Sequence, residues 1–164
     1  MIKPRRSPLF PSIVLVVSAF ASPTGRAQHD EHGHQRDAST AAVASLKLDG
    51  TQKWTTDASL RSGMAAIRSA FDADHPAIHA GKETDAQYEA LAGKIESQVN
   101  RIVAECKLPA DADANLHLVV ADLMSGVSLM RGQDAARTRH DGAALVHGAL
   151  VAYGRYFDDP GWKP

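Results

Sequence analysis

The chain has 164 residues, enough for one domain with its own core, and its charges nearly balance, with 18 basic against 19 acidic residues. It contains no dense run of Lys or Arg, so it does not have the basic clustering that supports nucleic-acid binding. Its one cysteine, Cys106, excludes an internal disulfide framework, and we expect packing alone to supply its stability.

Residues 1–27 have the features of a secretory signal peptide. Lys3 and Arg5 belong to a basic start, residues 13–21 are apolar, and small residues suited to cleavage follow up to Ala27. The apolar run is shorter than the roughly 20 residues that a membrane-spanning helix needs. We therefore expect a periplasmic or secreted protein that is not stably inserted in a membrane. Without the four basic residues of the leader, 14 basic residues would remain against 19 acidic ones.

Residues 28–52 are mostly polar and show no periodicity, which predicts a disordered arm before the folded domain. This arm carries His29, His32 and His34 within six residues. Imidazole nitrogens bind Cu(II) and Zn(II), so the tract is a candidate metal site. The alternative is that it is only a soluble, polar end of the mature chain.

Four later segments place apolar residues at helical spacing, and capping or stop signals bound each of them. Thr84 to Gln87 has the spacing of a capping box, and His75-Pro76 predicts the end of the first helix. Short loops between the helices predict an all-α fold, an up-down-up-down four-helix bundle over residues 53–164. The expected helices cover about residues 57–72, 84–106, 112–130 and 136–158.

In such a bundle, distant stretches of sequence meet at one end. Met64, Cys106 and His117 would lie near one another there, and thioether, thiolate and imidazole together suit Cu(I). The alternative is ordinary packing, since buried Met and Cys commonly act as simple hydrophobes. Trp54 and Trp162 belong to the same end, where aromatic rings would seal the bundle or dock a partner.

Two resemblances extend this interpretation. The segments "LDGTQKWTTDASLRSGMAAIR", "ETDAQY", "CKLPADADANLH" and "YGRYFDDPGWKP" resemble small exported bacterial proteins sometimes labelled DnrO-like, across most of the mature chain. That resemblance implies a four-helical exported protein and no particular activity. The segment "LRSGMAAI" is similar to the first helix of cytochromes of the b562 type, which implies Met64 as an axial haem ligand. Gly154 stands where those cytochromes have a histidine, so haem b would need His117 or His147 instead.

The sequence contains none of the common catalytic motifs, neither Gly-x-Ser-x-Gly, a phosphate-binding glycine loop nor His-Glu-x-x-His, and we expect a protein that is not an enzyme. The leading hypothesis is an accessory protein that buffers or delivers copper or a similar soft metal. The alternatives are a haem-b-binding protein and a metal-free module that docks a periplasmic protein partner. The candidate metal ligands are His29, His32, His34, Met64, Cys106 and His117.

Overall fold

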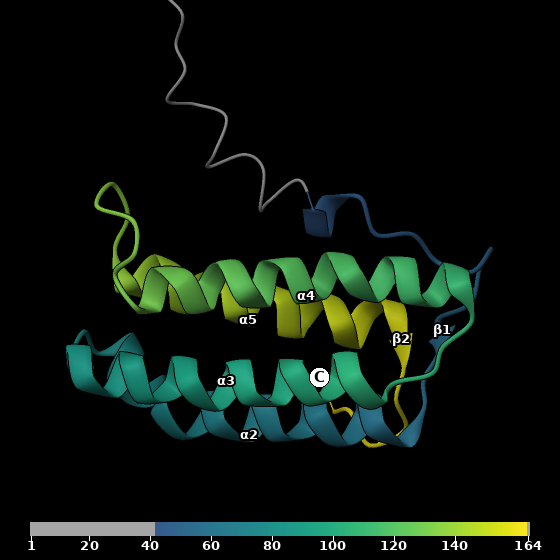
Figure 1. Cartoon of the computed structure of the whole chain (residues 1–164), viewed down its shortest axis with the longest axis horizontal. Helices are drawn as coiled ribbons and strands as arrows, with labels where there is room; N and C mark the ends of the chain where they lie inside the picture. The colour runs from purple at the N-terminus through teal and green to yellow at the C-terminus, as the bar shows by residue number, and fades with distance from the viewer. Residues whose placement is uncertain (1–41, 164) are drawn as a thin grey trace, which may run out of the picture. The chain divides into compact units, whose positions relative to one another are not determined.

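The computed structural model describes residues 42–163, in which four long helices form a bundle (Figure 1). The expectation of a helical bundle is confirmed for this part of the chain. The leader and His29, His32 and His34 lie outside the described residues. The elements are β1 (Trp54–Thr55), α2 (Ala58–His79), α3 (Asp85–Glu105), α4 (Ala110–Met130), α5 (Arg139–Tyr156) and β2 (Phe157–Asp158).

The helices begin where side chains satisfy their first backbone amides. The predicted capping box at the start of α3 is confirmed, because Thr84 and Gln87 each accept a hydrogen bond from the other's backbone amide. Thr138 and Asp141 form the same motif at the start of α5, which begins three residues later than the sequence predicted. Local capping chemistry therefore fixes these boundaries.

The predicted end of the first helix is wrong, because α2 continues through Pro76 to His79. A proline removes one backbone hydrogen bond, and here it falls in the last turn, where Ile78 is buried in the core. The helix ends at His79, and Gly81 follows the C-cap residue Ala80 with a φ of +65°, which suits a residue without a side chain. Burial of the last turn therefore outweighs the cost of the proline.

The helices form two layers, α2 beside α3 and α4 beside α5, which can be followed in Figure 1. The most extensive packing joins α4 to α5, where Gly126 faces Gly142. A Cβ atom added at Gly142 would lie 2.6 Å from the Gly126 carbonyl oxygen, so the two backbones are in contact. α2 and α5 pack against each other least among these neighbouring pairs. No described helix is both long enough and apolar enough to cross a membrane.

The chain before α2 and the chain after α5 are joined in a small parallel sheet. Trp54 of β1 pairs with Phe157 of β2, and the Thr56 hydroxyl donates to the Asp158 carbonyl at 2.6 Å. Leu46 is already part of the core, and the Trp54 indole donates to the Lys47 carbonyl at 2.6 Å. The chain therefore already packs on the bundle before residue 53, where we expected the folded domain to start. Strands of two residues are too short to show an alternating pattern in the sequence.

Candidate ligand-binding groove

The structure places Met64 and His117 in different environments. Met64 is fully buried in the core face of α2. The His117 side chain on α4 is 64% exposed, and its Nδ1 lies 2.8 Å from the Asp113 carbonyl of the same helix. The thioether thus faces the core while the imidazole faces solvent, and the structure does not bring these two candidate ligands together.

Cys106 takes part in a junction between the end of α3 and the start of α2. Burial, together with the nearby Asp57 carboxylate, raises the pKa of the half-buried Cys106 thiol to about 11, so the thiol is protonated at neutral pH. The thiol is hydrogen-bonded to Asp57, which also accepts from the amides of Leu60 at 2.7 Å and Lys107 at 2.6 Å. This contact gives Cys106 a structural role at the junction.

Asp57 holds this junction through its charge. Burial alone would raise its pKa, but the amides of Leu60 and Lys107, the Cys106 thiol and the Arg61 guanidinium outweigh burial and lower it. The carboxylate therefore caps α2 and ties the α3–α4 connection to it.

The space beside Gly154, where the resemblance to b562-type cytochromes led us to look for a haem histidine, is filled by an indole. A Cβ atom at Gly154 would lie 2.3 Å from Nε1 and 2.6 Å from Cδ1 of Trp162. The Trp162 ring meets the Tyr153 ring edge-on, with centroids 4.7 Å apart, and the Arg68 guanidinium lies 4.8 Å from its centroid. A histidine at position 154 would require this indole to move.

A different group of histidines gathers around Phe71, near the far end of α2. The His75 ring centroid lies 6.1 Å from those of His79 and His147, with the rings stacked. Within residues 42–163, no three His, Cys, Asp or Glu side chains are placed to hold a metal ion.

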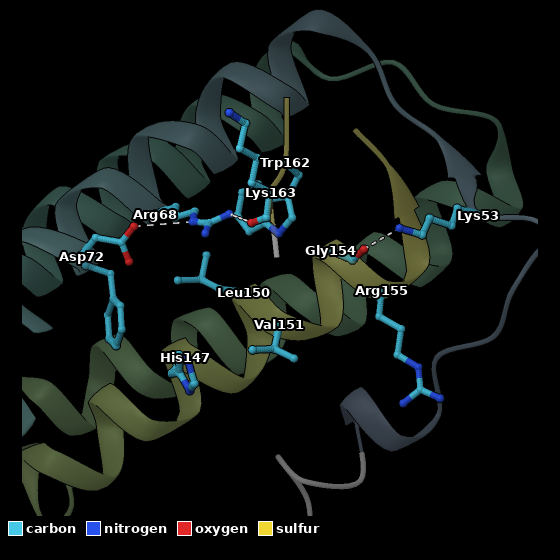
Figure 2. A pocket seen from close by; sticks show the side chains of 11 residues that line it. Lys53, Arg68, Asp72, His147, Leu150, Val151, Gly154, Arg155, Trp162 and Lys163 are labelled. Atoms are coloured by element: carbon cyan, nitrogen blue, oxygen red, sulfur yellow. Dashed lines mark hydrogen bonds and ion pairs between the residues drawn. The ribbon is translucent and has the colours of Figure 1, made fainter. Parts of the chain in front are cut away.

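A cavity of about 440 Å³ lies between α2 and α5, where these helices pack least (Figure 2). The segment after β2 forms one end of it. Tyr153 donates to the Asp159 carboxylate at 3.0 Å, which places that segment, and Arg68 donates to the Lys163 carbonyl. Burial and the negative charge of Asp159 both raise the pKa of Tyr153, so its phenol stays protonated as the donor. We call this cavity the α2/α5 groove.

The floor of the α2/α5 groove is apolar and partly aromatic. Phe71 of α2 and Leu150 of α5 are buried core residues that reach its surface, while Val151 is 58% exposed. Figure 2 shows Leu150, Val151 and the Trp162 side chain around the same hollow. The floor offers hydrophobic and ring surface to a ligand that is apolar on one side.

The rim of the groove is positively charged. Four cationic side chains line it, against the single carboxylate of Asp72. Arg68 pairs with Asp72 at 3.5 Å, and the Lys53 ammonium donates to the Gly154 carbonyl at 2.7 Å, as Figure 2 shows. This excess contrasts with the near balance of charge in the whole chain. The cations are Lys53, Arg68, Arg155 and Lys163.

The sequence did not predict this groove. Its lining comes from the segment before β1, from α2, from α5 and from the segment after β2, and no spacing motif links them. One signal was available, because Trp162 and Lys163 follow Pro160-Gly161 at an end already expected to be aromatic. The structure shows on which side of the bundle that segment lies, namely between α2 and α5.

No family model, curated protein or solved structure matches the chain. The resemblances to the DnrO-like proteins and to the b562-type cytochromes therefore stay predictions. Function has to be argued from the geometry of the groove.

Proposed function

We propose that this protein is an exported, non-enzymatic binding protein whose α2/α5 groove takes a small amphiphilic organic anion. Such a ligand combines an apolar, preferably aromatic, body with a carboxylate, sulfonate or phosphate head. The observation that carries the proposal is the lining of the groove, which sets four cations and one carboxylate around an apolar floor in about 440 Å³.

The size and chemistry of the groove support this ligand class. Pockets of about 300–1,000 Å³ hold most of a small organic ligand, and burial of its apolar part contributes about 25 cal/mol per Å². An anionic head at the rim would accept charge-assisted hydrogen bonds from Lys or Arg, each stronger than a neutral one. Phe71 and Trp162 would contact the ring of the ligand.

Binding fits the lining better than turnover does. The described residues around the groove include no hydroxyl or thiol nucleophile. Its carboxylate, Asp72, pairs with Arg68, and its imidazole, His147, stacks on Phe71 with centroids 5.9 Å apart. The ion pair engages Asp72, and the lining offers His147 no nucleophile to activate.

Titration calorimetry with 2-naphthoate tests the proposal. We expect wild-type protein to bind 2-naphthoate, and the variant Lys53→Gln with Lys163→Gln to bind it about tenfold more weakly, because two charge-assisted contacts are lost. The matched control, Lys82→Gln with Lys107→Gln, removes the same charge from exposed loop positions outside the groove and should bind normally.

Two results would contradict this function. One is equal weakening in both double variants, which would indicate a general charge effect. The other is equal binding of the neutral analogue 2-naphthol, which would show that the cations do not select the ligand.

A second candidate function concerns the arm. We also propose that His29, His32 and His34 bind Cu(II), because three imidazoles within six residues can share one ion. Replacing these three residues with Gln should abolish copper uptake measured by elemental analysis. The matched control replaces His75, His79 and His147 with Gln and should retain the copper. The opposite pattern would reject the arm as the site.

A further inference from the structure

A second cavity, of about 410 Å³, lies where the segment before β1 covers α4 and α5. Val43 and Ala44 form one side of it, and Asp122 of α4 lies at its wall. Most of the lining is small and apolar, which leaves open space beside the helix backbone of α5. The α5 residues that supply this lining are Ala144, Leu145, Gly148, Val151 and Ala152.

Asp122 is the unusual residue of this cavity. It is 3% exposed and is the one polar or charged residue that is buried within residues 42–163. Its carboxylate accepts a hydrogen bond from the Val43 amide, but Oδ1 has no hydrogen-bond partner. A buried carboxylate oxygen without a partner is destabilising, and native structures rarely leave one.

The Asp122 carboxylate has no charged partner: Oδ1 is enclosed and makes no hydrogen bond, and the Val43 amide is the one backbone group that donates to the carboxylate. Arg155 and Tyr156 of α5 are the other ionisable residues of the cavity, and Val43 and Ala44 contribute none. Arg155 is exposed, its guanidinium lies 5.5 Å from the Tyr156 ring centroid, and no ion pair joins it to Asp122 in the described structure. Arg155 therefore lies at the mouth of this cavity as well as at the rim of the α2/α5 groove, and no ion pair compensates the negative charge at the wall.

We propose that this cavity binds a small amphiphilic amine, whose ammonium group donates to the Asp122 carboxylate while its apolar body packs against the small residues of α5. The lining argues against an inorganic cation, because Ca²⁺ and Mg²⁺ need several oxygen ligands and Asp122 supplies the one carboxylate. An ammonium group needs few acceptors and tolerates an apolar surrounding for the rest of its molecule. This site is separate in chemistry from the α2/α5 groove, since it takes a cation where the groove takes an anion.

Calorimetry with benzylamine tests the proposal on the full mature chain. At about pH 7.5 we expect benzylamine to bind wild-type protein, and Asp122→Asn to weaken binding at least tenfold, because the counter-charge is lost. Asp111→Asn is the matched control, since it removes an exposed carboxylate from the same helix and should leave binding unchanged. The variant Ala144→Leu keeps Asp122 but fills part of the cavity, and it should also block benzylamine.

The pH dependence gives an independent measurement. Burial raises the pKa of Asp122 to about 6, so its negative charge is present at about pH 7.5 and largely lost at about pH 5. Wild-type affinity should fall about tenfold between these two values, while the affinity of Asp122→Asn should not change.

Three results would overturn the proposal. They are equal benzylamine binding by wild type and Asp122→Asn, equal binding of neutral benzyl alcohol, and no binding of benzylamine by the folded wild-type protein. The groove variant Lys53→Gln with Lys163→Gln should bind benzylamine normally, so failure at one site can be told from failure at the other.

Discussion

The two sides of α5 differ in how closely another helix approaches. Toward α4, a Cβ atom added at Gly126 would lie 2.7 Å from the Gly142 carbonyl oxygen, so the two backbones touch. Toward α2, the Trp162 indole and the Arg68 side chain lie between the helices, and a cavity of about 440 Å³ remains. Small residues thus close one side of the helix, while large and charged residues hold the other side open.

This difference separates the parts of the molecule that determine the fold from those that can bind a ligand. Direct backbone contact leaves no volume for a ligand, but it gives α4 and α5 one defined packing. Side chains that hold helices apart provide charge, ring surface and space at the same place. The fold can therefore be stable while one of its helix pairs remains loosely packed.

The closed side of α5, toward α4, predicts the greatest loss of stability. Gly142→Ala places a methyl group 2.6 Å from the Gly126 carbonyl oxygen and 2.7 Å from the Met130 amide nitrogen, and we expect it to lower the free energy of unfolding by about 3 kcal/mol. Gly148→Ala is the matched control on the same helix, because nothing lies within 4 Å of its added Cβ. It should stabilise the protein by about 0.5–1 kcal/mol through helix propensity. Urea unfolding of both variants measures the difference, and equal effects would refute the close contact.

The second prediction concerns Asp122 of α4, which lies at a cavity where α4 and α5 are not in close contact. The raised pKa of Asp122, about 6, means that the folded state binds its proton more tightly than the unfolded state does. The contribution of Asp122 to stability should therefore be fully present below the ordinary carboxylate pKa and be lost as the pH rises through about 6, by about 3 kcal/mol.

The measurement is the free energy of urea unfolding at several pH values for wild type and Asp122→Asn. The loss of stability toward neutral pH should be smaller in Asp122→Asn and persist in Asp111→Asn. An identical pH profile in wild type and Asp122→Asn would contradict the assignment of this pH dependence to Asp122.

The third prediction concerns the contacts that hold α2 in the bundle, because α2 packs only slightly against α5. Asp57 anchors the start of α2 to the end of α3 through Lys107 and Cys106. Asp57→Ala should cost about 1–2 kcal/mol, more than Thr138→Ala, which removes a cap without a second tether. Alkylation of Cys106 by iodoacetamide should also become faster, since the carboxylate that helps raise the thiol pKa to about 11 is gone. An unchanged alkylation rate would show that Asp57 does not raise the pKa of the Cys106 thiol.

Local patterns predicted the helices well because helix formation depends on local chemistry. The capping box of Thr84 and Gln87 and the buried positions Val146, Leu150 and Tyr153 of α5 follow from spacing alone. Pro76 was misjudged because the burial of Ile78, a tertiary effect, holds the last turn of α2.

The candidate metal site at the end of the bundle shows the limit of such patterns. His117 lies beside the buried Leu116 in sequence, yet its side chain faces solvent, because one residue along a helix turns the chain by about 100°. Gly154 looked in the sequence like a missing histidine. In the structure, its absent side chain makes room for the Trp162 indole, a contact between residues of different elements that no periodicity encodes.

The smallest expected change in stability tests the open side and completes the comparison along α5. Gly154→Ala places a methyl group against the Trp162 indole, whereas Gly142→Ala places one against a helix backbone. The indole belongs to the segment after β2, so it can move aside more easily than a helix backbone can. We expect a loss below about 1 kcal/mol, partly offset by the helix propensity of alanine. The displaced indole should change the tryptophan fluorescence spectrum and weaken 2-naphthoate binding, while Gly148→Ala leaves both unchanged. If Gly154→Ala instead destabilised the protein as much as Gly142→Ala, the α2 side of α5 would be as rigid as the α4 side, and the groove would not have the freedom to admit a ligand.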